Sequence, residues 1–184
     1  MAYQDQATLK RIQLLHPELR DEALIIYNEI VAGLTGNATV RFSYTLRTFA
    51  EQQVIYNQGR KTPGKIVSNA QAGQSFHNYG LAIDIVLLID KDRNGTYEEA
   101  RWDTLGDYDG DKFADWIECV RVFKKYGWVW GADWDNDNLT KAQGDKDENF
   151  VDMPHFQKTF NYTIKQLLAK HVAKQVDSQG YALI

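Results

Sequence analysis

Two histidines lie in polar segments where metal-binding side chains could gather. His77 precedes an apolar segment that carries Asp84, and Asp152 stands three residues before His155. Two imidazoles and one carboxylate are a frequent ligand set for catalytic zinc, and they leave a fourth position for a water molecule. Asp152 would then be free to take a proton from that water. These residue types and spacings indicate metal-assisted hydrolysis.

A structural role would explain Asp84 equally well. Asp84 lies between Ile83 and Ile85 in a segment that should be buried, and a buried carboxylate needs a cation or several hydrogen bonds. A metal ion, an ion pair or backbone donors would each satisfy it. Side chains at i and i+3 of a regular strand point to opposite faces, so Asp152 and His155 can share a site only if the chain bends between them.

The spacing of apolar side chains predicts the elements that must position these residues. A strand is predicted over 39–46, and a central strand over 81–89 carries Asp84. The other predicted segments are helices in 6–34 (two), 48–58, 112–126 and 159–174, loops over 60–76, 90–111 and 131–149, a short strand at 128–130 and extended chain at 150–156. This irregular mixture predicts an α+β fold with a small, mainly antiparallel sheet packed against helices.

Two of the predicted helices have clear start signals. Pro17 is favoured at a first helical position, where its missing N–H would have no partner. Thr48 and Glu51 have the spacing of a capping box. The two remaining histidines, His16 and His171, lie beside one helix and within another, and both are interpreted as surface or packing residues.

Composition excludes several classes of protein. The 184 residues are 43% apolar and 25% charged, which predicts one globular domain over residues 1–184. The net charge of −4 argues against a nucleic-acid partner. The single cysteine, Cys119, allows no intrachain disulfide and is interpreted as a buried apolar residue. With no signal peptide and no transmembrane run, synthesis in the cytoplasm is expected.

The histidine segments form a two-part pattern that is specific in spacing, order and separation. Ser75 and the series His77-x-x-Gly80-x-Ala82-x-Asp84 are followed far downstream by Asp152-x-x-His155. This pattern resembles the signature of the family of DD-carboxypeptidases and L-alanyl-D-glutamate peptidases, whose fold resembles that of Hedgehog domains. Segments similar to its endopeptidase and phage endolysin branch are Leu46-Arg47-Thr48, Glu51-Gln52, Gln58-Gly59-Arg60, Pro63-Gly64 and Trp130-Gly131-Ala132-Asp133-Trp134.

The resemblance covers roughly residues 16–160. It departs at Ala132, where glycine is expected, and in a longer and more polar segment over 135–149. It implies a Hedgehog/DD-peptidase-like fold, with His77, Asp84 and His155 as zinc ligands. Asp152 would act as the general base and then donate its proton to the leaving amine.

The resemblance also implies roles for residues around this centre. Arg47 would stabilise the oxyanion or hold the substrate carbonyl. A salt bridge to Glu51, four residues further along, is an alternative role for the same side chain. Substrate contacts are expected for Ser75, Tyr79 and Trp130.

An acidic loop is a second predicted metal site, for calcium. Its oxygen ligands, at positions 1, 3, 5, 9 and 12 of a calcium loop, would be Asp107, Asp109, Asp111, Asp115 and Glu118. Lys112 occupies the position where such loops need glycine, and it is also the predicted start of a helix. The segment from Asp90 to Asn94 begins in the same way, but Arg101 stands in place of its closing glutamate. The alternative is a solvated loop whose aspartates cap a helix start.

The main hypothesis is a zinc peptidase that cuts the peptidoglycan stem peptide between L-alanine and D-glutamate. The nearest alternative is a D-alanyl-D-alanine carboxypeptidase. A non-catalytic zinc-binding module is the alternative of another class, against which the predicted base Asp152 argues. A monomeric phage or prophage lysis enzyme, released to the cell wall, is favoured over a cytoplasmic recycling enzyme.

Overall fold

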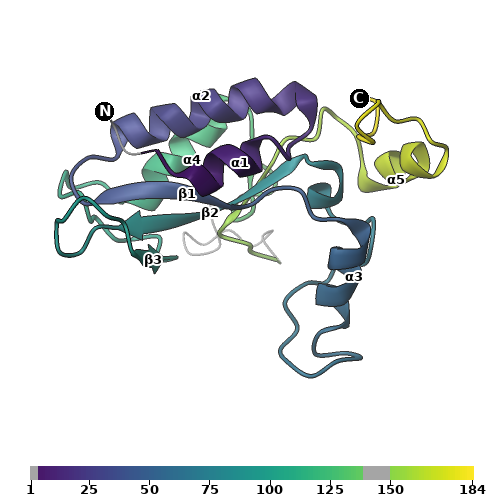
Figure 1. Cartoon of the computed structure of the whole chain (residues 1–184), viewed down its shortest axis with the longest axis horizontal. Coiled ribbons are helices and arrows are strands. Elements are labelled where there is room, and N and C mark those ends of the chain that lie inside the picture. The colour runs from purple at the N-terminus through teal and green to yellow at the C-terminus, as the bar shows by residue number, and fades with distance from the viewer. Residues whose placement is uncertain (1–3, 139–149) are drawn as a thin grey trace.

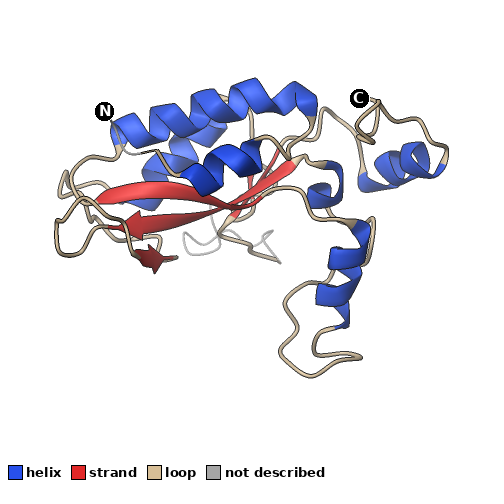
Figure 2. Cartoon of the chain, in the orientation of Figure 1, coloured by secondary structure: helices blue, strands red, loops and turns tan. Residues whose placement is uncertain are grey.

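The computed structural model describes residues 4–138 and 150–184. A five-stranded antiparallel sheet carries helices on one face, which confirms the predicted α+β class (Figures 1 and 2). The elements in chain order are α1 (Gln6–Ile12), α2 (Pro17–Gly33), β1 (Ala38–Tyr44), α3 (Phe49–Asn57), the 3₁₀ helix η1 (Phe76–Tyr79), β2 (Ala82–Ile89), β3 (Glu99–Arg101), α4 (Asp115–Lys125), β4 (Val129–Trp130), β5 (His155–Gln157) and α5 (Ile164–Val172).

Strand β2 lies at the centre of the sheet, as its continuous apolar sequence predicts. The strand order is β1-β2-β5-β4, and β3 also pairs with β2. The register places Asp84 of β2 opposite Tyr44 on β1 and opposite His155 on β5. This long-range pairing brings Asp84 and His155 together, although 71 positions separate them in the sequence.

The core lies between the helices and the sheet. A series of aromatic contacts crosses it from Tyr27 of α2 to Phe42 of β1, Phe123 of α4 and Phe156 of β5, with ring centroids 5.7, 5.8 and 4.1 Å apart. Cys119 is fully buried in the same cluster, as its apolar surroundings predict. The single domain over 1–184 stays a prediction, and this shared core supports it.

Two predicted helix starts are correct, and backbone conformation explains two wrong ones. Pro17 and the Thr48 capping box are where the sequence predicts them. Helix α4 begins at Asp115 rather than at Lys112, because Lys112 has a φ of 80°. Helix α5 begins at Ile164 rather than at 159, because Phe160 and Asn161 have φ values of 50° and 63°. The short strand β3 falls inside the predicted loop 90–111.

The turn from η1 into β2 requires glycine. Gly80 has a φ of 68°, and an added Cβ would lie 2.6 Å from the backbone nitrogen of His16. At this close approach the Gly80 carbonyl accepts a hydrogen bond from His16 N at 3.0 Å. The contact fixes η1, which carries His77, against the start of α2.

Helix α3 and the loop after it project from the body of the protein (Figure 1); we call residues 49–70 the arm. Arg60 holds the returning loop, because its guanidinium donates to the carbonyls of Tyr56 and Ser68 and to Asn69 Oδ1 at 2.8, 2.8 and 2.9 Å.

Among the described residues, no helix is both long and apolar enough to cross a membrane.

Candidate active site

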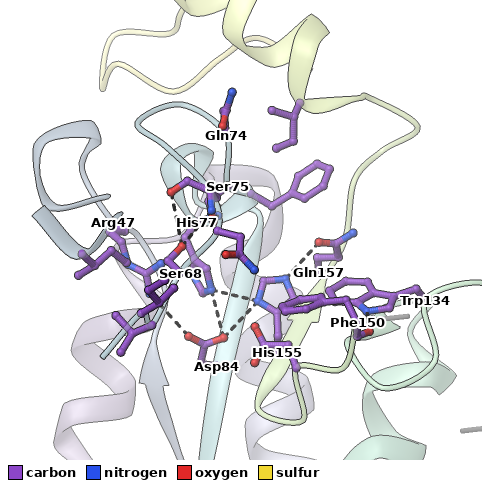
Figure 3. Close-up of a pocket in the computed structure, with 18 residues that line it drawn as sticks. Arg47, Ser68, Gln74, Ser75, His77, Asp84, Trp134, Phe150, His155 and Gln157 are labelled. Carbon is purple, nitrogen blue, oxygen red and sulfur yellow. Dashed lines mark hydrogen bonds and ion pairs between the residues drawn. The ribbon is translucent and has the colours of Figure 1, made fainter. Parts of the chain in front are cut away.

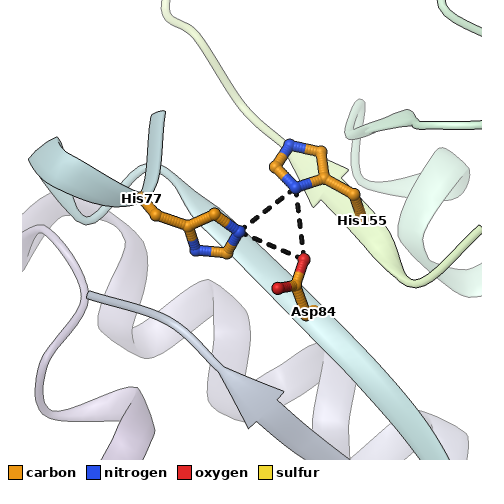
Figure 4. Close-up of side chains that lie close together, drawn as sticks. All are labelled: His77, Asp84 and His155. Carbon is orange, nitrogen blue, oxygen red and sulfur yellow. Dashed lines mark hydrogen bonds and ion pairs between the residues drawn. The ribbon is translucent and has the colours of Figure 1, made fainter. Parts of the chain in front are cut away.

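Three predicted ligands converge beside the centre of the sheet. His77 Nε2 lies 3.1 Å from Asp84 Oδ1, His155 Nδ1 lies 3.2 Å from the same oxygen, and the two ring nitrogens are 3.2 Å apart (Figure 4). His77 comes from η1, Asp84 from β2 and His155 from β5. Both histidines are at most 7% exposed. The structure thus brings together the three side chains that the sequence separates.

The hydrogen-bond partner of the outer nitrogen of each imidazole determines whether the inner nitrogen, which faces the cluster, has a free lone pair. His77 Nδ1 lies 2.6 Å from the carbonyl oxygen of Thr45, which can only accept, so this nitrogen carries the hydrogen. A neutral His77 therefore directs the lone pair of Nε2 toward Asp84. His155 Nε2 lies 3.1 Å from Gln157 Oε1, which likewise leaves Nδ1 of a neutral ring with a lone pair. Three lone pairs then face one point, and a cation is needed between them.

The donor set fits a zinc ion. Tetrahedral zinc with bonds of about 2.0–2.1 Å holds neighbouring ligand atoms about 3.3 Å apart, and the three observed separations are 3.1–3.2 Å. Two imidazoles and a carboxylate leave one position open, as in catalytic rather than structural zinc sites. The pocket beside the cluster gives that open position access to solvent.

The electrostatics of the cluster favour positive charge at the point where the three side chains meet. Burial by itself would raise the pKa of Asp84, but the imidazoles of His77 and His155 outweigh burial and hold that pKa far below its ordinary value. Burial would lower the pKa of His155, yet Asp84 and Asp152 raise it overall. The carboxylates that raise this pKa would also attract a metal ion. Protons and a metal ion therefore compete for this site.

Asp152 reaches the same pocket because the chain bends, as the sequence argument required. The His155 amide donates to the Asp152 carbonyl at 3.0 Å, which closes a turn through Met153 and Pro154. Gly131 holds this turn: its carbonyl accepts from Asp152 N at 2.7 Å, and a Cβ on Gly131 would lie 2.4 Å from the Asp152 carbonyl oxygen. Burial, aided by the nearby Asp84 carboxylate, raises the pKa of Asp152.

Arg47 is directed at the cluster rather than toward Glu51 on the following helix α3. Its Nη2 lies 3.8 Å from Asp84 Oδ2, its Nη1 donates to Gln52 Oε1 at 3.0 Å, and its guanidinium carbon is 4.6 Å from the centre of the Tyr44 ring. Glu51, the alternative partner, instead closes the capping box at the start of α3. The placement of Arg47 is therefore compatible with a role beside a substrate carbonyl.

A pocket of ≈ 630 Å³ opens above the cluster (Figure 3). Arg47 and Ser68 lie on one side of the cluster, and Trp134 and Phe150 lie on the other. The residues that line it are Arg47, Ile55, Ile66, Val67, Ser68, Asn69, Ala70, Gln74, Ser75, Phe76, His77, Asp84, Trp134, Phe150, Asp152, His155, Gln157 and Ile164. The arm therefore forms one wall of a mixed polar and apolar pocket that could hold a peptide.

The structure separates the three residues predicted to contact substrate. Ser75 lines the pocket and caps η1. Tyr79 does not line it: the side chain is 2% exposed, its hydroxyl donates to the Gly73 carbonyl at 2.8 Å, and burial raises its pKa to about 12. Trp130 is 4% exposed and donates to the Met153 carbonyl at 2.7 Å. Substrate contact therefore stays a prediction for Tyr79 and Trp130, whose buried side chains do not line the pocket.

The predicted calcium ligands form two groups rather than one. Each group has its ligand atoms within 4.8 Å, and the groups are Asp107 with Asp109 and Asp115, and Asp109 with Asp111 and Glu118. Several of these oxygens accept backbone hydrogen bonds; Asp107 Oδ2, for instance, accepts from Lys112 N at 3.0 Å. The Asp90 carboxylate likewise accepts from Asn94 N and Gly95 N at 3.0 and 2.8 Å. Local capping thus explains part of this acidic pattern.

The sequence argument assigned no role to two glutamines beside the site. Gln52 is fully buried, and its amide joins Arg47 to the arm by donating to Ser68 Oγ and the Ala70 carbonyl at 3.0 and 2.7 Å. Gln157 contacts His155 from two positions along β5. The i, i+2 spacing within an extended segment could have indicated Gln157, because such side chains share a face. Nothing local indicates the contacts of Gln52.

Comparisons with known proteins give three likenesses. A family model described as D-alanyl-D-alanine carboxypeptidase matches residues 68–139, which include His77 and Asp84. The peptidoglycan L-alanyl-D-glutamate endopeptidase CwlK of Bacillus subtilis (strain 168) is 34% identical over 145 residues, or 78% of this chain and 72% of that protein. The crystal structure of the Serratia marcescens L-Ala D-Glu endopeptidase ChiX aligns with a TM-score of 0.48 and 20% identity, over 84% of this chain and 88% of that one.

Proposed function

Because the chain belongs to the metallopeptidase family of L-alanyl-D-glutamate endopeptidases and D-alanyl-D-alanine carboxypeptidases, we propose that it hydrolyses the L-alanyl-D-glutamate bond of peptidoglycan stem peptides. The observation that carries the chemistry is the convergence of His77 Nε2, Asp84 Oδ1 and His155 Nδ1 within 3.2 Å of one another. The likeness to CwlK supports the choice of bond.

We propose His77, Asp84 and His155 as the ligands of a zinc ion. Zinc in such a site lowers the pKa of water and polarises a carbonyl. The Thr45 carbonyl holds the His77 ring so that Nε2 faces inward. Outer partners of this kind fix the tautomer and orientation of metal-ligating histidines.

Two further residues have separate roles: Asp152 transfers protons, and Arg47 stabilises negative charge on the substrate. Asp152 takes a proton from the attacking water and then gives it to the leaving amine; its raised pKa suits a base that must later act as an acid. Arg47 donates a hydrogen bond to the carbonyl oxygen as negative charge develops there. In a partly buried pocket this interaction is stronger in the transition state than in the ground state.

The direct experiment is digestion of purified peptidoglycan by the zinc-loaded protein. We expect new N-terminal D-glutamate on the released peptides. Release of free D-alanine instead would establish the carboxypeptidase alternative, which the description of the matching family model keeps open. Full zinc binding with no product from any stem peptide would leave the non-catalytic zinc module.

Two further predictions remain with this function. The biological setting stays a prediction: the enzyme acts either in phage or prophage lysis or in recycling in the cytoplasm. Expression inside a bacterial host, with lysis as the readout, would test it.

Calcium binding by the acidic loop also stays a prediction. It is supported by Glu118 Oε2, a buried oxygen with no hydrogen-bond partner among the described residues, and calorimetry on metal-stripped protein tests it. Absence of heat at millimolar calcium would remove it.

A further inference from the structure

The two imidazoles of the proposed zinc site are held in different ways. His77 Nδ1 faces a backbone carbonyl, that of Thr45, at 2.6 Å. His155 Nε2 faces a side-chain amide, that of Gln157, at 3.1 Å. A backbone carbonyl can only accept a hydrogen bond, whereas a glutamine amide can present either an acceptor oxygen or a donor NH₂ group. The tautomer of His155 therefore depends on which end of Gln157 faces it.

The backbone around Gln157 is held on both sides. Gln157 pairs with Ala82 on β2 and with Val129 on β4, while His155, two positions earlier, pairs with Asp84. The i, i+2 spacing places the side chains of His155 and Gln157 on the same face of the sheet. Gln157 thus approaches the outer nitrogen of His155 from a rigid strand (Figure 3).

We propose that Gln157 is a positioning residue that keeps the Nε2 hydrogen on His155 and so frees the Nδ1 lone pair for the metal. If the amide presented its NH₂ group, Nε2 would have to accept, and a neutral ring would carry its hydrogen on Nδ1. That hydrogen would point toward Asp84 Oδ1 and His77 Nε2, 3.2 Å away in each case, and would occupy the metal position. This inference rests on the proposed zinc site.

Two substitutions of Gln157 test whether the hydrogen-bond acceptor, rather than the size of the side chain, is what matters. Gln157→Met keeps the length of the side chain but removes the acceptor. Gln157→Glu keeps an acceptor and removes the donor end altogether. We expect the methionine variant to bind zinc about 10–100-fold more weakly than wild type, the usual cost of losing an outer partner. The glutamate variant should bind at least as tightly as wild type.

The measurement is zinc affinity by competition with a chelator, with thermal unfolding of the metal-free proteins as the folding control. Gln53→Met is the matched control, because Gln53 contacts Asn57 on α3 and does not line the pocket. Activity of Gln157→Met should return to that of wild type at saturating zinc, since a positioning role acts through metal occupancy. A residue that only contacts substrate would leave the activity impaired at any zinc concentration.

The outcomes distinguish this inference from the proposed function. If wild type binds no zinc and cuts no stem peptide, the proposed function itself fails. If wild type binds zinc and is active, but Gln157→Met has the same zinc affinity, only the positioning role is overturned. The same conclusion holds if Gln157→Glu loses affinity to the same extent as Gln157→Met.

Discussion

The histidine cluster and the acidic loop over 107–118 both gather groups that bind metals, but they use their lone pairs differently. In the cluster, ligand atoms from η1, β2 and β5 face one point, and the outer nitrogen of each ring lies against a separate acceptor. In the acidic loop, most carboxylates accept from backbone N–H groups nearby in the chain, as Asp111 Oδ1 does from Phe113 N at 2.7 Å. Asp109 Oδ2 also accepts from Thr35 N at 2.8 Å, just after the end of α2.

Similar residue types therefore take different roles, depending on whether they come from segments distant in the sequence or from one local run. Strand pairing can direct side chains at a common point, because each comes from a separately fixed backbone. A local run of aspartates satisfies its own turn first. The acidic loop nevertheless keeps uncompensated charge: burial, with nearby carboxylates, raises the pKa of Asp115 to about 6 and that of Glu118 to about 7.

The largest effect should come from removing the oxygen shared by both imidazoles. We expect Asp84→Ala to weaken zinc binding by more than the roughly 10–100-fold cost of losing an outer partner, and to abolish hydrolysis. Asp107→Ala, the matched carboxylate deletion in the acidic loop, should keep the zinc affinity of wild type. Chelator competition measures both. Equal zinc affinity for Asp84→Ala and wild type would contradict the contrast between the two regions.

The next effect concerns Asp152, which shares the pocket but is not proposed as a ligand. Asp152→Asn should lower kcat by about 10²–10⁴-fold, the usual contribution of a general base. Its zinc affinity should stay close to that of wild type, because His77, Asp84 and His155 remain. Stem-peptide hydrolysis and zinc titration of the same preparation provide the check. A parallel loss of zinc would instead make Asp152 part of the metal site.

A smaller effect is expected when calcium is added to the zinc-loaded protein. A ligand at 100 times its Kd stabilises a protein by about 2.7 kcal/mol, and each kcal/mol raises Tm by about 2–4 °C in a chain of this size. Millimolar calcium should therefore raise Tm by several degrees in wild type and much less in Glu118→Gln. Differential scanning calorimetry measures this shift, and equal shifts in both proteins would exclude Glu118 as a ligand.

The smallest effect is the pH dependence contributed by the acidic loop. Carboxyl groups whose pKa is raised on folding bind protons more tightly in the folded state, so stability falls as pH rises. The contribution of Asp115 and Glu118 is full below their ordinary values of 3.8 and 4.5 and is lost as pH passes about 6 and 7. In calcium-free buffer, urea unfolding of Glu118→Gln should show a weaker decline than wild type across this window. Identical profiles would contradict the raised pKa.

The sequence by itself determined most of the elements and the residues that gather in the histidine cluster. Apolar spacing and capping signals fixed the central strand, the start of α2 and the start of α3, because these depend on residues close in the chain. The two-part pattern of His77, Asp84, Asp152 and His155 pointed to the family, which the likeness to CwlK confirms.

Only the tertiary structure decided how these residues are used. The turn that brings Asp152 to the pocket depends on Gly131, the direction of Arg47 depends on Gln52, and the lone pair of His155 depends on Gln157. The family resemblance implied substrate contacts for Tyr79 and Trp130, yet both side chains are packed away from the pocket. Which atoms face one another is set by strand register and burial, and these arise from contacts between segments that are distant in the sequence.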